Sequence, residues 1–352
     1  MGATILVTGG AGFIGSHIVD LLLANGHAVR VLDALLPAAH RERPDYLDPA
    51  AEWIEGDLRD PSVAARAVAG VAGVSHQAAM VGLGVDLGDV PDYVAHNDFA
   101  TAQLLSALAA SRFAGRLVLA SSMVVYGEGR YACAEHGVVA PGARRAADLD
   151  AGRFEPPCPH CGRPLAPETV PEDAALDPRS VYAATKVAQE NLCAVFSRET
   201  DVPVTALRYH NVYGPRMPRD TPYAGVASSF RSAYAAGRAP RVFEDGGQRR
   251  DFVHVRDVAR ANILALTAPE PVPGAFNVAS GTARTVLEMA RALARACDAP
   301  PEAAPRVTGE WRAGDVRHVV ASPARAAEGI GFVAREDFEA GMGEFASAPL
   351  RG

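Results

Sequence analysis

The order of apolar and polar positions predicts alternating strands and helices from the N-terminus onward. A β-branched run, Thr4–Thr8, precedes a glycine-rich turn and an apolar helical pattern that continues to Leu23. Asn25-Gly26 ends this helix, and Ala28–Leu32 reads as the next strand. Further strands are expected at Trp53–Glu55, Gly73–His76 and Arg116–Ala120, with helices near 97–111 and 182–198. Repeated strand–helix units predict an α/β fold with a Rossmann-type, doubly wound parallel sheet.

The glycines after the first strand lie where a dinucleotide fingerprint requires them. The run Thr8-Gly9-Gly10-Ala11-Gly12-Phe13-Ile14-Gly15 lets the backbone turn tightly, approach a pyrophosphate and open a helix. Asp33 closes the second strand 18 residues after Gly15, where a carboxylate binds a ribose 2′-hydroxyl and repels a 2′-phosphate. NAD is therefore the predicted cofactor. Because ligands sit at the carboxyl ends of such strands, its expected contacts are Gly9, Gly12, Phe13, Ile14, Asp33, Asp57, Leu58, Ala78 and Ala79.

Composition singles out one basic residue. Of the 34 lysines and arginines, all except Lys186 are arginine, which suggests that this position needs a compact ammonium. Lys186 follows Tyr182 by four residues in a predicted helix, so both side chains share one face. A nearby ammonium stabilises a phenolate, which predicts Tyr182 as a general base and Lys186 as its partner and a ligand of the nicotinamide ribose. Ser122, at a strand end, is expected to hydrogen-bond the reacting hydroxyl.

These motifs resemble the extended short-chain dehydrogenase/reductases, in the nucleotide-sugar epimerase and dehydratase group. The resemblance rests on the fingerprint, Asp57-Leu58, the stretch from His76, Ser-Ser-x-x-Val-Tyr-Gly, Tyr-x-x-x-Lys and three later segments, which begin at Arg208, Arg250 and Arg312. It implies that Asn211, Arg250 and Arg312 bind the nucleotide diphosphate and sugar, which suits guanidinium chemistry. It also implies that Asn97, expected to open its helix, supports the cofactor site, and that the chain forms a homodimer.

The residues after Ser122 bear on the reaction. By the same resemblance, 4,6-dehydratases carry an Asp-Glu pair directly after the catalytic Ser or Thr, whereas this chain has Met123 and Val124, which cannot transfer protons. The pattern favours a 4-epimerase that oxidises and re-reduces C4 with bound NAD. The segment from Arg208 resembles bacterial deoxysugar epimerases of the dTDP-L-rhamnose type; UDP-hexose, UDP-uronic acid and GDP-sugar substrates stay open. The alternatives are a dehydratase, reductase or decarboxylase on the same fold, and a non-enzymatic NAD-sensing regulator.

An insertion at about 128–176 carries a metal-binding signature. It is polar, rich in Pro, Gly and Arg, and shows no helical or strand periodicity. Cys133, His136, Cys158 and Cys161 form Cys-x₂-His and Cys-x₂-Cys pairs suited to a tetrahedral, structural zinc in a zinc-knuckle-like fold. A disulfide or redox pair between Cys158 and Cys161, unrelated thiols, and His160 in place of His136 are the alternatives.

The net charge and the order of the motifs predict the partners, the location and the domain boundaries. The net charge of −7 disfavours nucleic acid or an anionic membrane as a partner, and no leader or long apolar run is evident, so a cytoplasmic location is expected. We expect an NAD-binding domain at 1–210, which contains the insertion. A smaller region at 211–352 is expected to bind the nucleotide sugar, with 252–267, read as a strand and then a helix, returning to the first domain.

Overall fold

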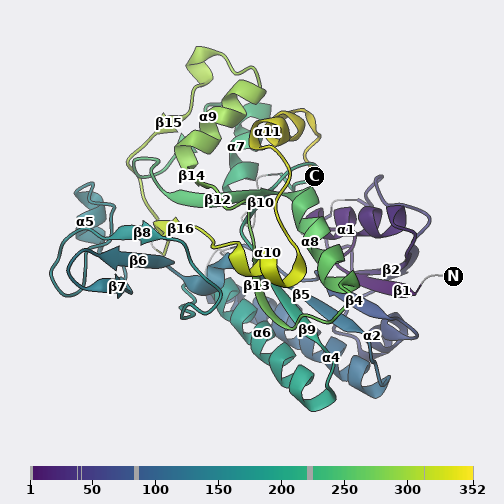
Figure 1. The fold of residues 1–352 in the computed structure, drawn as a ribbon. Helices are drawn as coiled ribbons and strands as arrows, with labels where there is room; N and C mark the ends of the chain where they lie inside the picture. The colour runs from purple at the N-terminus through teal and green to yellow at the C-terminus, as the bar shows by residue number, and fades with distance from the viewer. Residues whose placement is uncertain are drawn as a thin grey trace.

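A seven-stranded parallel sheet forms the centre of the computed structural model, which describes residues 3–37, 39–40, 42–82, 87–219, 225–312 and 314–351 (Figure 1). Its strands are β1 (Thr4–Thr8), β2 (Ala28–Asp33), β3 (Glu52–Glu55), β4 (Gly73–His76), β5 (Arg116–Ser122), β9 (Val204–Tyr209) and β13 (Gly274–Val278). They lie in the order β13-β9-β5-β4-β1-β2-β3, so the chain reverses direction across the sheet between β1 and β4. This is the order of a doubly wound Rossmann sheet, and it confirms the predicted fold class.

Helices cover both faces of this sheet because alternate strand residues are apolar on both sides. Leu6 of β1 packs with α2 (Pro61–Val68), α4 (Ala100–Ala110) and α6 (Val181–Thr200). Val7, the next residue, packs on the opposite face with α1 (Phe13–Ala24), α8 (Val255–Thr267) and α10 (Ala324–Ile330). Such burial on both faces is what continuous apolar strands predict. No helix in the described part of the chain is long and apolar enough to cross a membrane.

A smaller unit lies beside the carboxyl ends of the central strands. Its sheet contains β10 (Asn211–Tyr213), β12 (Arg249–His254), β14 (Ala283–Thr285) and β16 (His318–Val319). A separate apolar core joins this sheet to α7 (Val226–Ala235), α9 (Val286–Ala296) and α11 (Phe338–Ser347). A two-stranded sheet, β11 (Arg241–Val242) and β15 (Arg306–Val307), lies nearby. The strand and helix expected at 252–267 are β12 and α8, and α8 lies against α1 on the central sheet.

The helix expected to open at Asn97 begins earlier. It starts with α3 (Val90–Tyr93), continues through a π-helical segment (Val94–Phe99) and then becomes α4. Pro91 lies in the first turn, where a missing N–H costs no hydrogen bond, so it supports this earlier start. The prediction that Asn97 opens the helix is therefore wrong.

The insertion has regular structure, contrary to the expectation from its sequence. It contains β6 (Arg130–Cys133), β7 (Gly137–Val139), α5 (Ala146–Asp150) and β8 (Ala166–Glu168), and the three strands pair antiparallel in the order β7-β6-β8. These elements have three to five residues each, too few for a visible period. They form a lobe on one side of the molecule (Figure 1), with a small core that includes Tyr131, Cys133, Cys158 and Leu165.

Candidate active site

The glycine loop is shaped by close backbone approaches. Gly9 has φ +68°, and a Cβ atom there would lie 2.8 Å from the backbone nitrogen of Ala78. At Gly15 a Cβ would lie 2.2 Å from the Gly9 carbonyl oxygen, so any side chain would push α1 away from the loop. Gly12 caps α1 without a side-chain hydrogen bond, so no side chain caps the first turn, which begins at Phe13 and Ile14. An uncapped helix N-terminus of this kind suits an anion.

Two carboxylates lie at neighbouring strand ends beside this loop. Asp33 accepts hydrogen bonds from the backbone N–H groups of Ala11 and Leu35, both at 2.9 Å, which fix the carboxylate next to the glycines. Asp57 lies just beyond β3 and pairs with Arg59 at 2.6 Å; hydrogen bonds from Arg59 hold the pKa of Asp57 below its usual value. Asp57 is therefore already neutralised by a protein cation, whereas the hydrogen bonds to Asp33 from the described residues come from backbone N–H groups.

The remaining predicted cofactor contacts are apolar or backbone groups. Leu58 is buried beneath the strand ends. Ala78 follows β4 and donates its N–H to Thr8 Oγ1 at 3.2 Å, which brings Ala78 and Ala79 to the same edge as the glycine loop. This edge, between β1 and β4, is the switch point at which doubly wound sheets bind ligands.

The three predicted catalytic side chains come together at the end of β5 and the first turns of α6. Ser122 is the last residue of β5, and its side chain hydrogen-bonds with Tyr182. Lys186 is 3% exposed; its Nζ lies 5.7 Å from the centre of the Tyr182 ring and donates to the Ala120 carbonyl oxygen at 2.9 Å. Ser180 caps α6 through the Ala183 N–H at 3.1 Å and so fixes where the helix begins.

Burial shifts the pKa values of both Tyr182 and Lys186. Burial raises the pKa of Tyr182, and the Ser122 hydrogen bond offsets only part of this rise. Burial also lowers the pKa of Lys186 to about 8, against the attraction of Glu190 and Asp98. The ammonium donates to the Ala120 carbonyl oxygen, and the Ser122 hydrogen bond is the contact that lowers the pKa of Tyr182 here.

Asn97 is a buried residue that links two segments next to the site through hydrogen bonds. Its side-chain amide donates to Met80 O at 3.0 Å and to Thr185 Oγ1 at 2.9 Å, and it accepts from Met80 N at 2.7 Å. The fully buried amide thus joins the chain after β4 to α6. These hydrogen bonds fix the chain around Met80, just beyond the predicted cofactor contacts Ala78 and Ala79, against α6.

Sequence reasoning missed two acidic residues near Lys186. Asp98 has one buried carboxylate oxygen with no hydrogen-bond partner in the described part of the chain, and burial raises its pKa to about 6. Glu190 forms a bidentate pair with Arg208 at 2.9 and 2.7 Å and also accepts from Ser121. The i,i+4 spacing from Lys186 to Glu190 was the available signal; the position of Arg208 on β9 was not readable from the sequence.

The three residues predicted to bind the nucleotide sugar lie around the smaller unit. Asn211 of β10 has a buried amide oxygen with no partner among the described residues. Arg250 of β12 donates to the carbonyl oxygens of Val316 and Arg317 at 2.6 and 2.9 Å. Arg312 is exposed, with its guanidinium 4.6 Å from the centre of the Phe243 ring. Residues 220–224, in the motif that begins at Arg208, lie outside the described residues.

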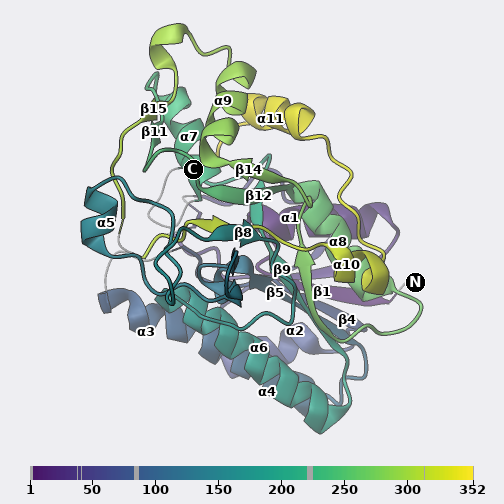
Figure 2. The same cartoon turned by 60° about the vertical axis from the view of Figure 1, so that its left-hand side comes forward.

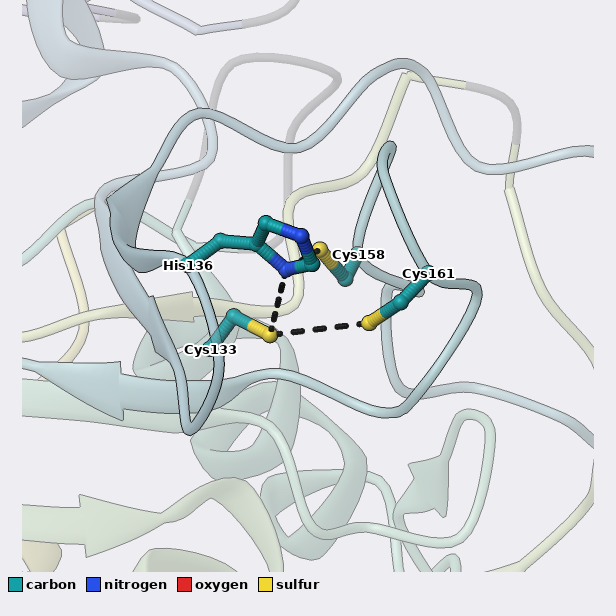
Figure 3. Close-up of side chains that lie close together, drawn as sticks. All are labelled: Cys133, His136, Cys158 and Cys161. Atoms are coloured by element: carbon teal, nitrogen blue, oxygen red, sulfur yellow. Dashed lines mark hydrogen bonds between the residues drawn. The ribbon is translucent and has the colours of Figure 1, made fainter.

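The four predicted metal ligands meet at one point of the insertion (Figure 3). Cys133 Sγ lies 3.4 Å from His136 Nδ1 and 3.6 Å from Cys161 Sγ, and all four donor atoms lie within 4.8 Å of one another. Zn–S bonds of about 2.3 Å in a tetrahedron put the ligand atoms about 3.8 Å apart, and the two distances from Cys133 Sγ are close to this value. His160 lies against His136, with ring centres 5.0 Å apart, and is outside the cluster.

Backbone amides also face the sulfurs. Cys133 receives hydrogen bonds from the side chain of His136 and from the backbone of Glu135, which together lower the pKa of this thiol to about 6. The backbone of Arg163 hydrogen-bonds Cys161. None of the five cysteines is in a disulfide, so the alternative Cys158–Cys161 bridge is not formed in this structure.

Comparison with known proteins agrees with this geometry. The model of the family described as "NAD dependent epimerase/dehydratase family" matches residues 5–142 and 158–279. A dTDP-L-rhamnose 4-epimerase of Burkholderia thailandensis is 34% identical over 97% of this chain and 94% of its own length. The UDP-glucose 4-epimerase of Thermus thermophilus, solved with NAD, is 31% identical with a TM-score of 0.75, over 97% of both chains.

A second solved structure extends the range of ligands. The UDP-N-acetylglucosamine 4-epimerase of Methanobrevibacter ruminantium, in complex with UDP-N-acetylmuramic acid, superposes with a TM-score of 0.77 at 28% identity. It covers 98% of this chain and 97% of its own. A structure with a bound nucleotide sugar and one with bound NAD thus share this fold.

Proposed function

The chain belongs to the NAD-dependent epimerase/dehydratase family, and we propose that it is a nucleotide-sugar 4-epimerase that acts on dTDP-L-rhamnose or a related deoxysugar nucleotide. The observation that carries this function is the site at the end of β5, where Ser122, Tyr182 and Lys186 lie together. Met123 and Val124 directly follow Ser122, and neither can move a proton, so the Asp-Glu pair that dehydration would need is not at these two positions. The dTDP-L-rhamnose substrate is supported by the 34% identical relative.

NAD, when bound, supplies the hydride acceptor and donor for the sugar C4. The groups that would hold it are the glycine loop and α1 N-terminus at the diphosphate, Asp33 at a ribose and Lys186 at the nicotinamide ribose. They fit this cofactor: the loop excludes any Cβ at Gly9, and backbone N–H groups fix the Asp33 carboxylate, which would repel a 2′-phosphate.

Tyr182 and Ser122 carry the proton chemistry. Ser122 holds the C4 hydroxyl while the Tyr182 oxygen removes its proton, as hydride leaves C4 and a 4-keto sugar forms. After the sugar turns its other face, hydride returns to C4 and Tyr182 gives the proton back to the oxygen. Lys186 favours the phenolate in this cycle when its ammonium turns from Ala120 toward the tyrosine. The net reaction changes one stereocentre and consumes no redox equivalent.

Incubation in D₂O with dTDP-, UDP- and GDP-sugars, without added NAD, tests this function. We expect dTDP-L-rhamnose to yield an isomer with no deuterium on carbon, since the hydride moves between C4 and the cofactor without contacting solvent. Loss of water or deuterium on carbon in the product, read by chromatography and mass spectrometry, would contradict C4 hydride return. An absence of turnover across the panel, even with NAD restored, would favour the NAD-sensing regulator.

We further propose that Cys133, His136, Cys158 and Cys161 hold a structural zinc ion. Three sulfurs and one imidazole nitrogen within 4.8 Å form a complete tetrahedral donor set, which leaves no position for a catalytic water. The apolar core of the insertion is small, so a metal would supply much of its folding free energy.

Replacing Cys158 by serine tests the zinc site. We expect the purified wild type to contain about one zinc ion per chain and the variant to contain far less. The variant should also unfold at a lower temperature, because the insertion loses the ion that closes it. Cys297→Ser is the matched control, since Cys297 is half-buried and lies outside the cluster. Equal zinc content in wild type and Cys158→Ser, measured by inductively coupled plasma mass spectrometry, would argue against this ligand set.

The helices beside the catalytic site carry an apolar surface that suits a homodimer. Phe99 at the end of the π-helical segment is 48% exposed, and Leu192 and Val195 of α6 are 36% and 47% exposed. Figures 1 and 2 show α4 and α6 side by side along one edge of the molecule. We propose that two copies join through these helices. Sedimentation is expected to give a dimer for the wild type and a smaller species for Leu192→Glu; a wild-type monomer would contradict it.

We also propose that residues 1–210 bind NAD and 211–352 bind the nucleotide sugar, with 252–267 returning to the first domain. The position of α8 against α1 supports the return of the helical part of 252–267, whereas β12 lies in the smaller sheet and β13 of the central sheet comes from the second part of the chain. The cytoplasmic location, and the absence of nucleic-acid and membrane partners, stay predictions.

A further inference from the structure

Residues 315–318 form a segment whose backbone is held from two sides. On the inner side, Arg250 donates to the carbonyl oxygens of Val316 and Arg317 at 2.6 and 2.9 Å. Because Arg250 is also a proposed substrate ligand, the place of its guanidinium depends on where this segment lies. Arg312, the other proposed guanidinium ligand, precedes the segment by three residues.

On the outer side, side chains of the insertion form hydrogen bonds with backbone groups of residues 315, 317 and 318. Glu128 Oε2 accepts the Arg317 N–H at 2.8 Å, and the Tyr131 hydroxyl oxygen accepts the His318 N–H at 3.0 Å. Arg144 donates to the Asp315 carbonyl oxygen at 2.6 Å. These contacts join residues more than 150 positions apart in the sequence. Figure 1 shows β16, which begins at His318, between the insertion and β12.

Ion pairs also join the insertion to the segment 315–318; we call this contact region the junction. The Arg317 guanidinium is 3% exposed and pairs with Glu155 at 2.7 Å, with Glu244 at 2.9 Å and with Asp245 at 2.7 Å. Glu155 also accepts from His318 Nε2 at 2.9 Å. A buried guanidinium with three carboxylates is costly to disturb, because each lost partner leaves charge without compensation. Glu155 comes three residues before Cys158, so the proposed zinc site and this junction lie on one short stretch.

We propose that the insertion is a brace that positions Arg250 and Arg312 for the diphosphate of the nucleotide sugar, with Glu155 as a positioning residue. This inference rests on the proposed function, because it takes the two arginines as substrate ligands. The insertion itself contacts neither the glycine loop nor the Ser122–Tyr182 pair through any hydrogen bond or ion pair found among the described residues. Its effect should therefore fall on nucleotide-sugar affinity and leave NAD binding and the chemical step alone.

Glu155→Gln tests the brace with little change in volume. We expect KM for dTDP-L-rhamnose and the Kd of the probe dTDP each to rise about tenfold, as loss of a charged hydrogen-bond partner predicts. The kcat and the NAD content should stay within about twofold of wild type, whereas simple destabilisation would lower the active fraction and hence kcat. Glu168→Gln is the matched control, because Glu168 of β8 lies in the same insertion and forms an exposed pair with Arg130 at 2.9 Å.

Amide hydrogen exchange provides a readout that needs no substrate. Exchange at residues 315–318 should be faster in Glu155→Gln than in Glu168→Gln or the wild type. Equal exchange in the two variants, or faster exchange with unchanged KM and dTDP affinity, would overturn the inference. If the wild type turned over no dTDP-sugar, the proposed substrate would fail, while exchange and dTDP binding would still decide whether the insertion acts as a brace.

Discussion

Replacing Tyr182 by phenylalanine should reduce kcat by about a thousandfold, within the range that a positioned acid–base group contributes. The change removes one oxygen, the atom that takes and returns the C4 hydroxyl proton in the proposed cycle. No other proton-transferring side chain adjoins Ser122 in the described sequence around β5, because Met123 and Val124 follow it directly. Residual activity should therefore be that of bound NAD and an oriented sugar without a base.

The binding steps should survive this substitution. NAD content and dTDP affinity are expected to stay within about twofold of wild type, since Tyr182 interacts with the protein through Ser122 rather than through the glycine loop. Tyr234→Phe is the matched control: it removes the same oxygen from α7, where that hydroxyl has no hydrogen-bond partner among the described residues. Steady-state rates of both variants, with protein concentration fixed, give the comparison. A Tyr182→Phe variant with more than a tenth of wild-type kcat would rule out the tyrosine as the base.

The parts of the fold that could be predicted are those in which local sequence repeats a simple rule. Buried parallel strands such as β1 and β4 are short apolar runs next to turn residues, and their ends were predicted to within a residue or two. The π-helical segment and the elements of the insertion could not be predicted. A π-helix has no distinctive period, the strands of the insertion have only three or four residues, and the two-residue strand β16 is held by β12, far away in the sequence.

The residues of the candidate site could also be predicted where the sequence pattern is local, but their tertiary contacts could not. The glycine loop, Asp33 and the Tyr182–Lys186 spacing are local patterns, and the four metal ligands form two local pairs, so the sequence could indicate all of them. The sequence does not indicate which groups these side chains contact in the folded protein. The Lys186 ammonium turns to a carbonyl on β5, and Arg250 turns to the carbonyls of 316 and 317, because those partners are set by tertiary packing. Burial, which raises the pKa of Tyr182, depends on the same packing.

Lys186→Met should greatly reduce turnover and yet stabilise the protein. The variant loses the ammonium that favours the phenolate and holds the nicotinamide ribose, so kcat should fall by at least about a hundredfold. The same ammonium is costly to bury: a pKa lowered from 10.5 to about 8 means that folding disfavours the charged lysine, even with Glu190 and Asp98 nearby. Methionine fills a similar volume without that charge. Glu190 keeps its Arg208 partner, and Asp98, whose pKa is already about 6, can take up a proton.

The pH dependence separates this cause from better packing. Unfolded chains hold the lysine proton up to pH 10.5, whereas the folded chain releases it near pH 8, so wild-type stability rises with pH between these values. The penalty is fully present below pH 8. The advantage of Lys186→Met in urea unfolding should therefore be largest at about pH 7 and shrink toward about pH 10. Lys186→Arg keeps its charge over this range and should be both inactive and less stable than wild type. A methionine variant less stable than wild type at neutral pH would mean that the attraction of Glu190 and Asp98 exceeds the cost of burying the ammonium. The lysine would then stabilise the fold as well as take part in the reaction.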